Sequence, residues 1–524
     1  MRRQFTGLNC LSCSVLQRRH DFVTSELQGE SLNPAVCTKL IVSYAFFDEK
    51  IYVVICRAKR KFIGEGEYIY MSAIGNEMKI KNNYFDGLEV TKKQICLFIV
   101  VIASYFFENL DNNSFNFCAP AIMASMNIGT AGLAQITSAY YLGNTFGAIF
   151  GGIISDIIGR RKTLLISTFL FTTGTIVDAA TTDFTTFLVA RALTGFGILC
   201  MMVVTITYMA EMSPKESRGK WEGYIGGFGY LAAPAIGFIS GAIVPLHPEA
   251  WRNVFYIGGI GYILLIVSYF TIKESPRWLM SRGRQAEAED VVSSLVGMPI
   301  DLSDAVIVKK SRSNLAKDVQ KMFSPLYLKR TIVLFLILCG GVVSFNSTQP
   351  WMTTLLKMNG FSMQDSIFIS TIFTFGFPLG QFVAAYFADR GGRKIPIAVF
   401  GILYCVVTIP FVLFIKDNVI LAAILGLLVI AIGIARNFII HPYVAESLPT
   451  SQRNSVTGIL NGASRFASTG AQPLVPILFA AYGTMGVFGF AMGFSILTSI
   501  IAIFFGWRTA CKSLEELNEN ISQE

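Results

Sequence analysis

About twelve runs of apolar residues, each roughly 20 residues long, fill the chain from Ile95 to Trp507. A run of this length is what an α-helix needs to cross the ~30 Å hydrocarbon core of a bilayer. The composition agrees, with 53% hydrophobic and 15% charged residues, against about 25% charged in soluble proteins. The sequence therefore predicts an all-α membrane protein with spans near 95–120, 133–155, 163–181, 185–211, 219–244, 252–272, 329–351, 366–388, 395–415, 418–444, 454–481 and 484–507.

Basic residues lie in short clusters between these runs and not in one stripe, so the net charge of +9 does not indicate nucleic-acid binding. The clusters occupy alternate loops, such as Lys92–Lys93, 160–162, 215–220 and 390–394. Cytoplasmic loops carry the excess of Lys and Arg. We therefore expect a multi-pass protein of the plasma membrane with both termini in the cytoplasm.

Two polar segments each occur twice. Tyr208–Arg218 (YMAEMSPKESR) returns as Tyr443–Arg453 (YVAESLPTSQR), and Asp156–Lys162 (DIIGRRK) returns as Asp389–Lys394 (DRGGRK). Such internal repeats in a polytopic chain are typical of secondary transporters, whose substrate site lies near the bilayer midplane where the halves meet. We therefore expect two pseudo-symmetric six-helix bundles, at 95–272 and 329–508.

The remaining segments are assigned to the cytoplasm. Residues 1–94 form an N-terminal extension that we expect to be partly disordered, because apolar stretches such as Ile51–Cys56 are too short to span. Translation from Met71 or Met78 would instead give a short tail before the first span. Residues 509–524 form a C-terminal tail. The loop 273–328 holds an amphipathic helical pattern over Gly283–Leu295, with apolar positions at Ala286, Val291, Val292 and Leu295.

Three motifs resemble those of a known family. Gly152-x-x-x-Asp156-x-x-Gly159-Arg160-Arg161-Lys162 resembles the loop 2–3 signature of the major facilitator superfamily, and Arg191-x-x-x-Gly195-x-Gly197 is similar to its fourth-helix motif. Glu274–Leu279 (ESPRWL) resembles the sugar porter and organic ion transporter branch. The resemblance implies the major facilitator fold of twelve helices, a structural role for Gly195, and a structural or proton-relay role for Arg191. The helix-seven glutamine pair of sugar porters is missing, which argues against a hexose substrate.

The repeated segments are candidates for a gate. Alternating access requires contacts on one face of the protein that form and break, and carboxylate–arginine pairs at helix ends provide them. Nine residues have this character: Asp156, Arg160, Arg161, Glu211, Arg218, Asp389, Arg393, Glu446 and Arg453. The alternative is that the basic clusters only set the topology.

Two carboxylates inside the first span are candidates for proton coupling. Asp111 is the first choice and Glu108 the second; the i,i+3 spacing puts both on one helix face, roughly 20 to 24 Å from Ile95. A low-dielectric surrounding penalises the charged form of a carboxyl group, so such a group can take up and release a proton. Proton-coupled aromatic and organic acid carriers of the family also place acidic residues in helix one. The alternative is that both carboxylates reach the outer surface and are solvated.

Five polar residues in the spans are candidate substrate ligands. Asn112 lies in the same polar run, and the match of Ser114-Phe-Asn116-x-x-x-Pro120 to Ser344-Phe-Asn346-x-x-x-Pro350 adds Asn346 and its neighbour Gln349. Arg436 and Arg465 lie near mid-membrane in the tenth and eleventh spans. The guanidinium fork suits a carboxylate, which predicts an anionic substrate. The alternatives are interhelical packing for the amides and ion pairing with the helix-one carboxylates for the arginines.

These features predict a secondary transporter that imports a small organic acid with protons and is not an enzyme, since no phosphate-binding loop or catalytic motif is present. We expect no cofactor and no metal, because Cys10 and Cys13 have ligand spacing without a second pair. The expected partners are a small molecule, protons and lipid, without nucleic acid, and the expected state is a monomer. The alternatives are a sugar or polyol facilitator or symporter, a drug/proton antiporter suggested by Gly229–Gly237, and a nutrient sensor, which the short tail argues against.

Overall fold

The computed structural model describes residues 40–47, 50–57, 70–72, 78–79, 84–85, 88, 90–214, 217–303, 320, 322–387, 393–415, 418–448 and 453–507. The chain separates into two compact units, Met1–Asn76 and Glu77–Glu524. In the first unit, β1 (Leu40–Phe47) pairs antiparallel with β2 (Lys50–Arg57), which pairs antiparallel with β3 (Tyr70–Ser72). The sequence analysis had predicted no strands here, although Val, Ile and Tyr favour them. Cys10 and Cys13 lie outside the described residues.

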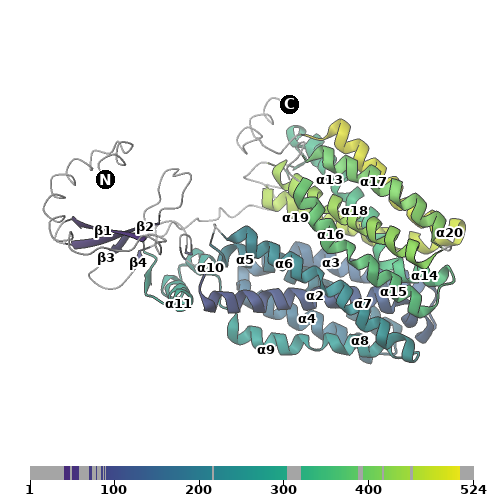
Figure 1. The fold of residues 1–524 in the computed structure, drawn as a ribbon, viewed down its shortest axis with the longest axis horizontal. Coiled ribbons are helices and arrows are strands. Elements are labelled where there is room, and N and C mark those ends of the chain that lie inside the picture. The colour runs from purple at the N-terminus through teal and green to yellow at the C-terminus, as the bar shows by residue number, and fades with distance from the viewer. Residues whose placement is uncertain are drawn as a thin grey trace, which may run out of the picture. The chain divides into compact units, whose positions relative to one another are not determined.

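The second unit contains the membrane helices, in two sequential halves (Figure 1). The N-terminal half comprises α2 (Lys92–Ser125), α3 (Thr130–Ile158), α4 (Arg160–Ala180), α5 (Phe184–Met212), α6 (Arg218–Tyr230), α7 (Ala232–Ile243), the short η1 (Val244–Leu246), α8 (Trp251–Gly258) and α9 (Gly261–Thr271). The C-terminal half comprises α13 (Pro325–Asn346), the short η2 (Gln349–Trp351), α14 (Met352–Met358), α15 (Met363–Thr374), α16 (Gly376–Phe387), α17 (Lys394–Phe414), α18 (Val419–Glu446), α19 (Arg453–Ala471) and α20 (Leu474–Phe505). The two halves meet chiefly where α3 contacts α19, α7 contacts α15, and α2 contacts α14.

Eleven helical segments within the described residues are long and apolar enough to cross a membrane. The eleventh and twelfth predicted spans, 454–481 and 484–507, are both helical but are divided differently. The polar helix α19 is followed, after Gln472 and Pro473, by the first part of α20, and α20 breaks at Gly483, where φ is +61°. Because this left-handed conformation favours glycine, Gly483 marks the boundary between the eleventh and twelfth spans. The all-α architecture with twelve spans is confirmed.

The loop between the halves carries α10 (Pro276–Ser281), α11 (Gln285–Val296) and the short strand β5 (Ile300–Asp301). The strand pairs in parallel with β4 (Met78–Lys79). Helix α11 is the predicted amphipathic helix, and Val291, Val292 and Leu295 are buried as expected. The prediction for Ala286 was wrong: it is exposed, and Ala288 is buried in its place. Ala288 lies three and four residues before Val291 and Val292, so it shares their face.

Glycines bring α3 and α5 into backbone contact. A Cβ atom at Gly143 of α3 would lie 2.0 Å from the carbonyl oxygen of Ala192, and one at Gly195 of α5 would lie 2.3 Å from the carbonyl oxygen of Tyr140. Small residues at such crossings allow helix backbones to approach closely inside a bilayer. The expected structural role of Gly195 therefore has a physical basis in this contact.

We expect Gly195→Ala to destabilise the protein by about 1–3 kcal/mol, because the added methyl group forces two backbones apart. Gly227→Ala is the matched control, since Gly227 also lies in a helix and a Cβ there would meet nothing within 4 Å. Thermal unfolding of the purified protein in detergent measures the difference. Equal unfolding temperatures for Gly195→Ala and the wild type would contradict the account.

Candidate functional site

The polar run in α2 is buried and remains helical. Glu108, Asp111 and Asn113 are 2%, 1% and 5% exposed. Side chains within the run bond back to the helix itself: Asn113 Nδ2 donates to the Asn109 carbonyl oxygen at 2.8 Å, and Ser114 Oγ donates to the Asp111 carbonyl oxygen at 2.7 Å. These bonds give Asn113 and Ser114 hydrogen-bond partners within α2 itself. The two carboxyl groups are then the side chains of this segment whose burial in the membrane costs the most free energy.

Asp111 faces the interior of the N-terminal half. Its Oδ2 accepts a hydrogen bond from Thr175 Oγ1 of α4 at 2.7 Å. Near it, Arg191 of α5 forms an ion pair with Asp178 of α4, with 2.6 Å between Nε and Oδ2, and both side chains are almost wholly buried. The Arg191 guanidinium also lies over three aromatic rings: Phe255 at 4.7 Å, Phe115 at 5.1 Å and Phe187 at 5.8 Å. Asp111 thus belongs to a buried ionic cluster, and it does not reach the outer surface.

Glu108 has different surroundings, although it lies only one turn before Asp111. Its Oε2 accepts a hydrogen bond from Asn109 Nδ2 at 3.0 Å, and Arg465 of α19 in the other half lies within electrostatic reach. Three tyrosines of the N-terminal half also surround Arg465: Tyr140 and Tyr141 of α3 and Tyr230 of α6. Glu108 and the three tyrosines therefore lie within electrostatic reach of Arg465 across the contact between the halves.

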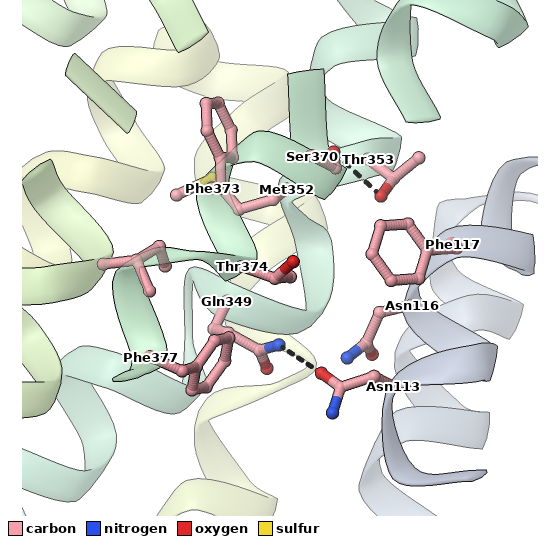
Figure 2. Close-up of a pocket in the computed structure, with 11 residues that line it drawn as sticks. Asn113, Asn116, Phe117, Gln349, Met352, Thr353, Ser370, Phe373, Thr374 and Phe377 are labelled. Carbon is pink, nitrogen blue, oxygen red and sulfur yellow. Dashed lines mark hydrogen bonds between the residues drawn. The ribbon is translucent and has the colours of Figure 1, made fainter. Parts of the chain in front are cut away.

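A pocket of about 290 Å³, part of it open to solvent, lies between the two halves next to this cluster. Figure 2 shows the amides of Asn113 and Asn116 facing Gln349 across it, with Phe117 and Phe377 at its sides. Gln349 Nε2 donates to Asn113 Oδ1 at 3.4 Å. The remaining lining residues are Met352, Thr353, Ser370, Phe373, Thr374 and Ile430. Gln349 is the one predicted ligand that lines this pocket.

The other two predicted amide ligands have partners on neighbouring helices. Asn112 Oδ1 accepts a hydrogen bond from Tyr140 OH of α3 at 2.5 Å. Asn346 Nδ2 donates to Ser468 Oγ of α19 at 3.3 Å, and the backbone carbonyl oxygen of Asn346 accepts from Gln472 Nε2 at 3.2 Å. Asn112 is thereby joined to the tyrosines around Arg465, while Asn346 ties α13 to α19.

Arg436 lies elsewhere. Its side chain is fully buried, donates to the Ser495 hydroxyl group and to the Gly341 carbonyl oxygen at 3.4 Å, and lies over the Tyr404 ring at 5.4 Å. These partners belong to α20, α13 and α17 of the C-terminal half. The sequence analysis grouped Arg436 with Arg465 as a substrate ligand, but the partners that the structure gives Arg436 all lie within the C-terminal half.

The predicted gate residues form ion pairs within each half. Arg160 Nε and Nη2 donate to both carboxylate oxygens of Glu211, at 3.0 and 3.1 Å, and Arg160 also pairs with Asp156 at 2.9 Å. In the other half, Arg393 pairs with Glu446 at 2.7 Å. No ion pair between described residues joins the two halves. The pairs therefore tie α3 and α4 to α5, and the start of α17 to α18.

The other gate residues are placed as follows. Arg161 Nη2 donates to the Tyr269 carbonyl oxygen at 2.6 Å. Arg218 is the first residue of α6, and Arg453 is the first residue of α19. Asp389 lies outside the described residues. The repeated segments thus stand at the same positions of the helix ends in both halves, as their repetition predicted.

Comparison with known proteins decides the family. The family model described as Major Facilitator Superfamily matches residues 101–473, with a second match over 343–516. The chain belongs to the major facilitator superfamily. It is 28% identical over 445 residues to the putative metabolite transport protein YyaJ of Bacillus subtilis, covering 82% of this chain and 96% of that protein. It is 29% identical over 314 residues to the 4-hydroxybenzoate transporter PcaK of Pseudomonas aeruginosa, covering 59% of this chain and 68% of that protein.

The fold agrees with this assignment. The partially occluded, inward-open structure of the xylose transporter XylE from E. coli matches 81% of this chain and 100% of that chain, with a TM-score of 0.64 and 18% identity. As a member of the superfamily, the chain is a multi-pass membrane transporter of small organic metabolites.

Glu274 caps a helix in this superfamily fold. The residue before α4 is Gly159, whose φ is +102° and which has no side chain to bond the first N–H groups. Glu274 replaces that cap from the loop after α9: its Oε1 accepts from the backbone N–H groups of Arg160 at 2.8 Å and Arg161 at 3.2 Å. Burial raises the pKa of Glu274, and the bonds from these N–H groups oppose that rise.

We expect Glu274→Ala to lower the stability by about 1 kcal/mol, the usual cost of a lost helix cap. Glu274→Gln should lose less, because its amide oxygen still accepts the two N–H bonds. Thermal unfolding in detergent again separates the two variants. If the alanine variant were as stable as the glutamine variant, Glu274 would not be the cap of α4.

Sequence reasoning missed several residues of the site. Asp178 and the tyrosines around Arg465 were not singled out, because a lone carboxylate or tyrosine in a span carries no spacing signal. His441 of α18, which lies near Arg465 and bonds to Asn461, was missed for the same reason. The adjacent Tyr140 and Tyr141 in a span rich in small residues were the one available hint.

Proposed function

We propose that the chain is a proton-coupled symporter that imports a small organic acid by alternating access. The observation that carries this proposal is Arg465, a cation between the two halves with Glu108 in electrostatic reach and tyrosines around it. Arg465 is half-buried in a membrane helix, and a guanidinium group in such a position needs an anionic partner. A substrate carboxylate can take the place of Glu108 once Glu108 is protonated, so binding of the acid is linked to uptake of a proton.

Asp111 is proposed as the principal coupling carboxylate, with Glu108 as the second. Asp111 is buried near Arg191 and Asp178, and among the described residues Thr175 alone donates a hydrogen bond to its carboxylate. Moving a net charge through the bilayer costs several kcal/mol, and protonation of Asp111 removes that charge. The nine residues of the repeated segments are proposed as the gate. Their ion pairs lie within each half in this structure, and they exchange for contacts between the halves when the gate closes.

The surroundings of Arg465 favour an aromatic monocarboxylate as the substrate. Tyr140, Tyr141 and Tyr230 supply ring faces and hydroxyl groups, and Phe377 stacks on Tyr230 at 5.7 Å. Aromatic pairs of this kind stabilise a bound ring through offset or edge contacts. The relative named as a 4-hydroxybenzoate transporter supports this class. Arg436 is not included in the site, since its partners all lie inside the C-terminal half.

A neutral sugar or polyol is the second candidate. The pocket in Figure 2 is lined by the amides of Asn113, Asn116 and Gln349, which suit hydroxyl groups better than a carboxylate. In that case Arg465 and Glu108 would form a structural tie between the halves. The two candidates differ in whether a carboxylate competes for the site.

A counterflow screen in proteoliposomes tests the proposal. We expect labelled 4-hydroxybenzoate to exchange with aromatic and small monocarboxylates, and not with sugars or quaternary amines. Exchange with sugars alone would favour the second candidate, and exchange with quaternary amines would favour a drug antiporter. The remaining proposals are that the transporter is a monomer of the plasma membrane and that both termini lie in the cytoplasm.

A further inference from the structure

A buried acceptor and a buried donor in the N-terminal half both lack partners. Within the described part of the chain, Asp111 Oδ1 accepts no hydrogen bond, and Arg191 Nη1 and Nη2 donate none. Arg191 Nε and both carboxylate oxygens of Asp178 also make no hydrogen bond, although these two side chains form an ion pair. Leaving such groups unsatisfied away from water costs about 1–3 kcal/mol each, and more for charged groups. The acceptor and the donors lie in the same cluster, and each is the partner that the other needs.

Arg191 forms an ion pair with Asp178 and not with Asp111. The pair is held at 2.6 Å, with side chains 0% and 1% exposed. Helix α8 supplies no competing group at this point: it faces Asp111 with Gly258, where a Cβ would lie 3.4 Å from Oδ1. Arg191 therefore lies within electrostatic reach of two carboxylates, and in this structure it forms an ion pair with Asp178.

The other titratable and charged groups around this cluster are few. From α2, Glu108 lies one turn before Asp111, and the Cys118 thiol lies near Arg191. From α8, Arg252 donates to the carbonyl oxygens of Ala179 and Thr181 at 2.8 and 2.5 Å, and it is paired with Glu249 at 2.6 Å. From α3, the Tyr140 hydroxyl group lies within electrostatic reach of both Asp111 and Glu108.

We propose that Asp178 is a positioning residue for proton coupling, which competes with Asp111 for Arg191 and so sets the pH at which Asp111 takes up its proton. When Asp111 is ionised, Arg191 can turn one of its free Nη groups toward it. When Asp111 takes a proton from water, it no longer attracts Arg191, which then rests on Asp178, as it does in this structure. The inference rests on the proposed coupling role of Asp111.

The test follows the carboxyl group itself and needs no substrate. The purified full-length protein in lipid is titrated, and infrared difference spectra record the protonated carboxyl band that is absent from Asp111→Asn. In Asp178→Asn, Asp111 is the remaining carboxylate near Arg191, and the guanidinium charge favours its ionised form. The pH at the midpoint of the titration of this band should therefore fall by about one unit or more. Asp178→Glu keeps the charge and should stay closer to the wild-type midpoint.

Asp178→Ser is a second neutral variant, with the same expected shift, should the asparagine variant fail to reach the membrane. An unchanged midpoint in the neutral variants, or no titrating band that depends on Asp111, would overturn the inference. Failure of the proposed function has a separate signature, which is accumulation of substrate by Asp111→Asn in transport assays. The two outcomes are therefore distinguishable.

Discussion

We expect Asp111→Asn to abolish accumulation of the substrate against its gradient, while exchange of substrate across the membrane continues. The asparagine side chain is neutral at every pH, so it carries no proton, and its amide oxygen can still accept the bond from Thr175. In the wild type, each coupled proton allows about tenfold accumulation per unit of pH gradient. In the variant, uptake should stop at the equilibrium level. Uptake with an imposed pH gradient and counterflow without one, both in proteoliposomes, measure the two activities.

Asp183→Asn is the matched control for this experiment. Asp183 lies in the same half but is exposed, and its carboxylate caps α5 by accepting from the Thr186 N–H at 2.7 Å. Asparagine caps a helix about as well as aspartate. The control should therefore accumulate substrate like the wild type. Accumulation by Asp111→Asn at the wild-type level would remove Asp111 from the coupling role and leave Glu108 as the candidate.

Arg465→Gln should weaken substrate binding by about 10- to 100-fold, because a charge-assisted hydrogen bond contributes about 1.5–3 kcal/mol. Arg465 is the cation that lies between the halves among the tyrosines, and glutamine keeps a polar side chain without the charge. The loss should appear as a higher KM for carboxylates in counterflow. Arg465→Lys should recover only part of the binding, since lysine keeps the charge but lacks the planar fork.

Arg284→Gln is the control for Arg465→Gln. Arg284 is exposed before α11 and pairs with Glu287, also exposed, at 2.5 Å. It lies outside the proposed site, so its loss should leave KM unchanged. If Arg465→Gln kept the wild-type KM, Arg465 would be a structural tie between the halves, and the substrate need not be an anion.

The sequence alone predicted the architecture because the bilayer imposes it. Runs of about 20 apolar residues leave few structures other than transmembrane helices, and the repeated segments set the division into halves. Boundaries were less predictable where a helix breaks without losing hydropathy, as at Gly483, whose positive φ has no counterpart in composition. The burial of Ala288 in place of Ala286 likewise depends on how α11 packs.

The site was predictable only in part. Costly ionic groups such as Asp111 and Arg465 stand out in an apolar span, whatever the fold. Their partners do not, because partners are set by helix rotation and packing in three dimensions. Glu108 and Asp111 share a helix face by spacing, yet one meets Arg465 and the other meets Thr175. The sequence places Arg436 and Arg465 at similar depths in the membrane, but the Arg436 side chain lies over the Tyr404 ring inside the C-terminal half.

The most direct test of proton-coupled acid import is the movement of protons with the substrate. Wild-type proteoliposomes in weakly buffered medium receive a pulse of 4-hydroxybenzoate, and a pH electrode follows the medium. We predict that the medium becomes alkaline in step with uptake. Liposomes that contain Asp111→Asn should show only the slow alkalinisation caused by passive diffusion of the free acid through the lipid. Uptake of the acid by the wild type without a change in external pH beyond that background would contradict the account.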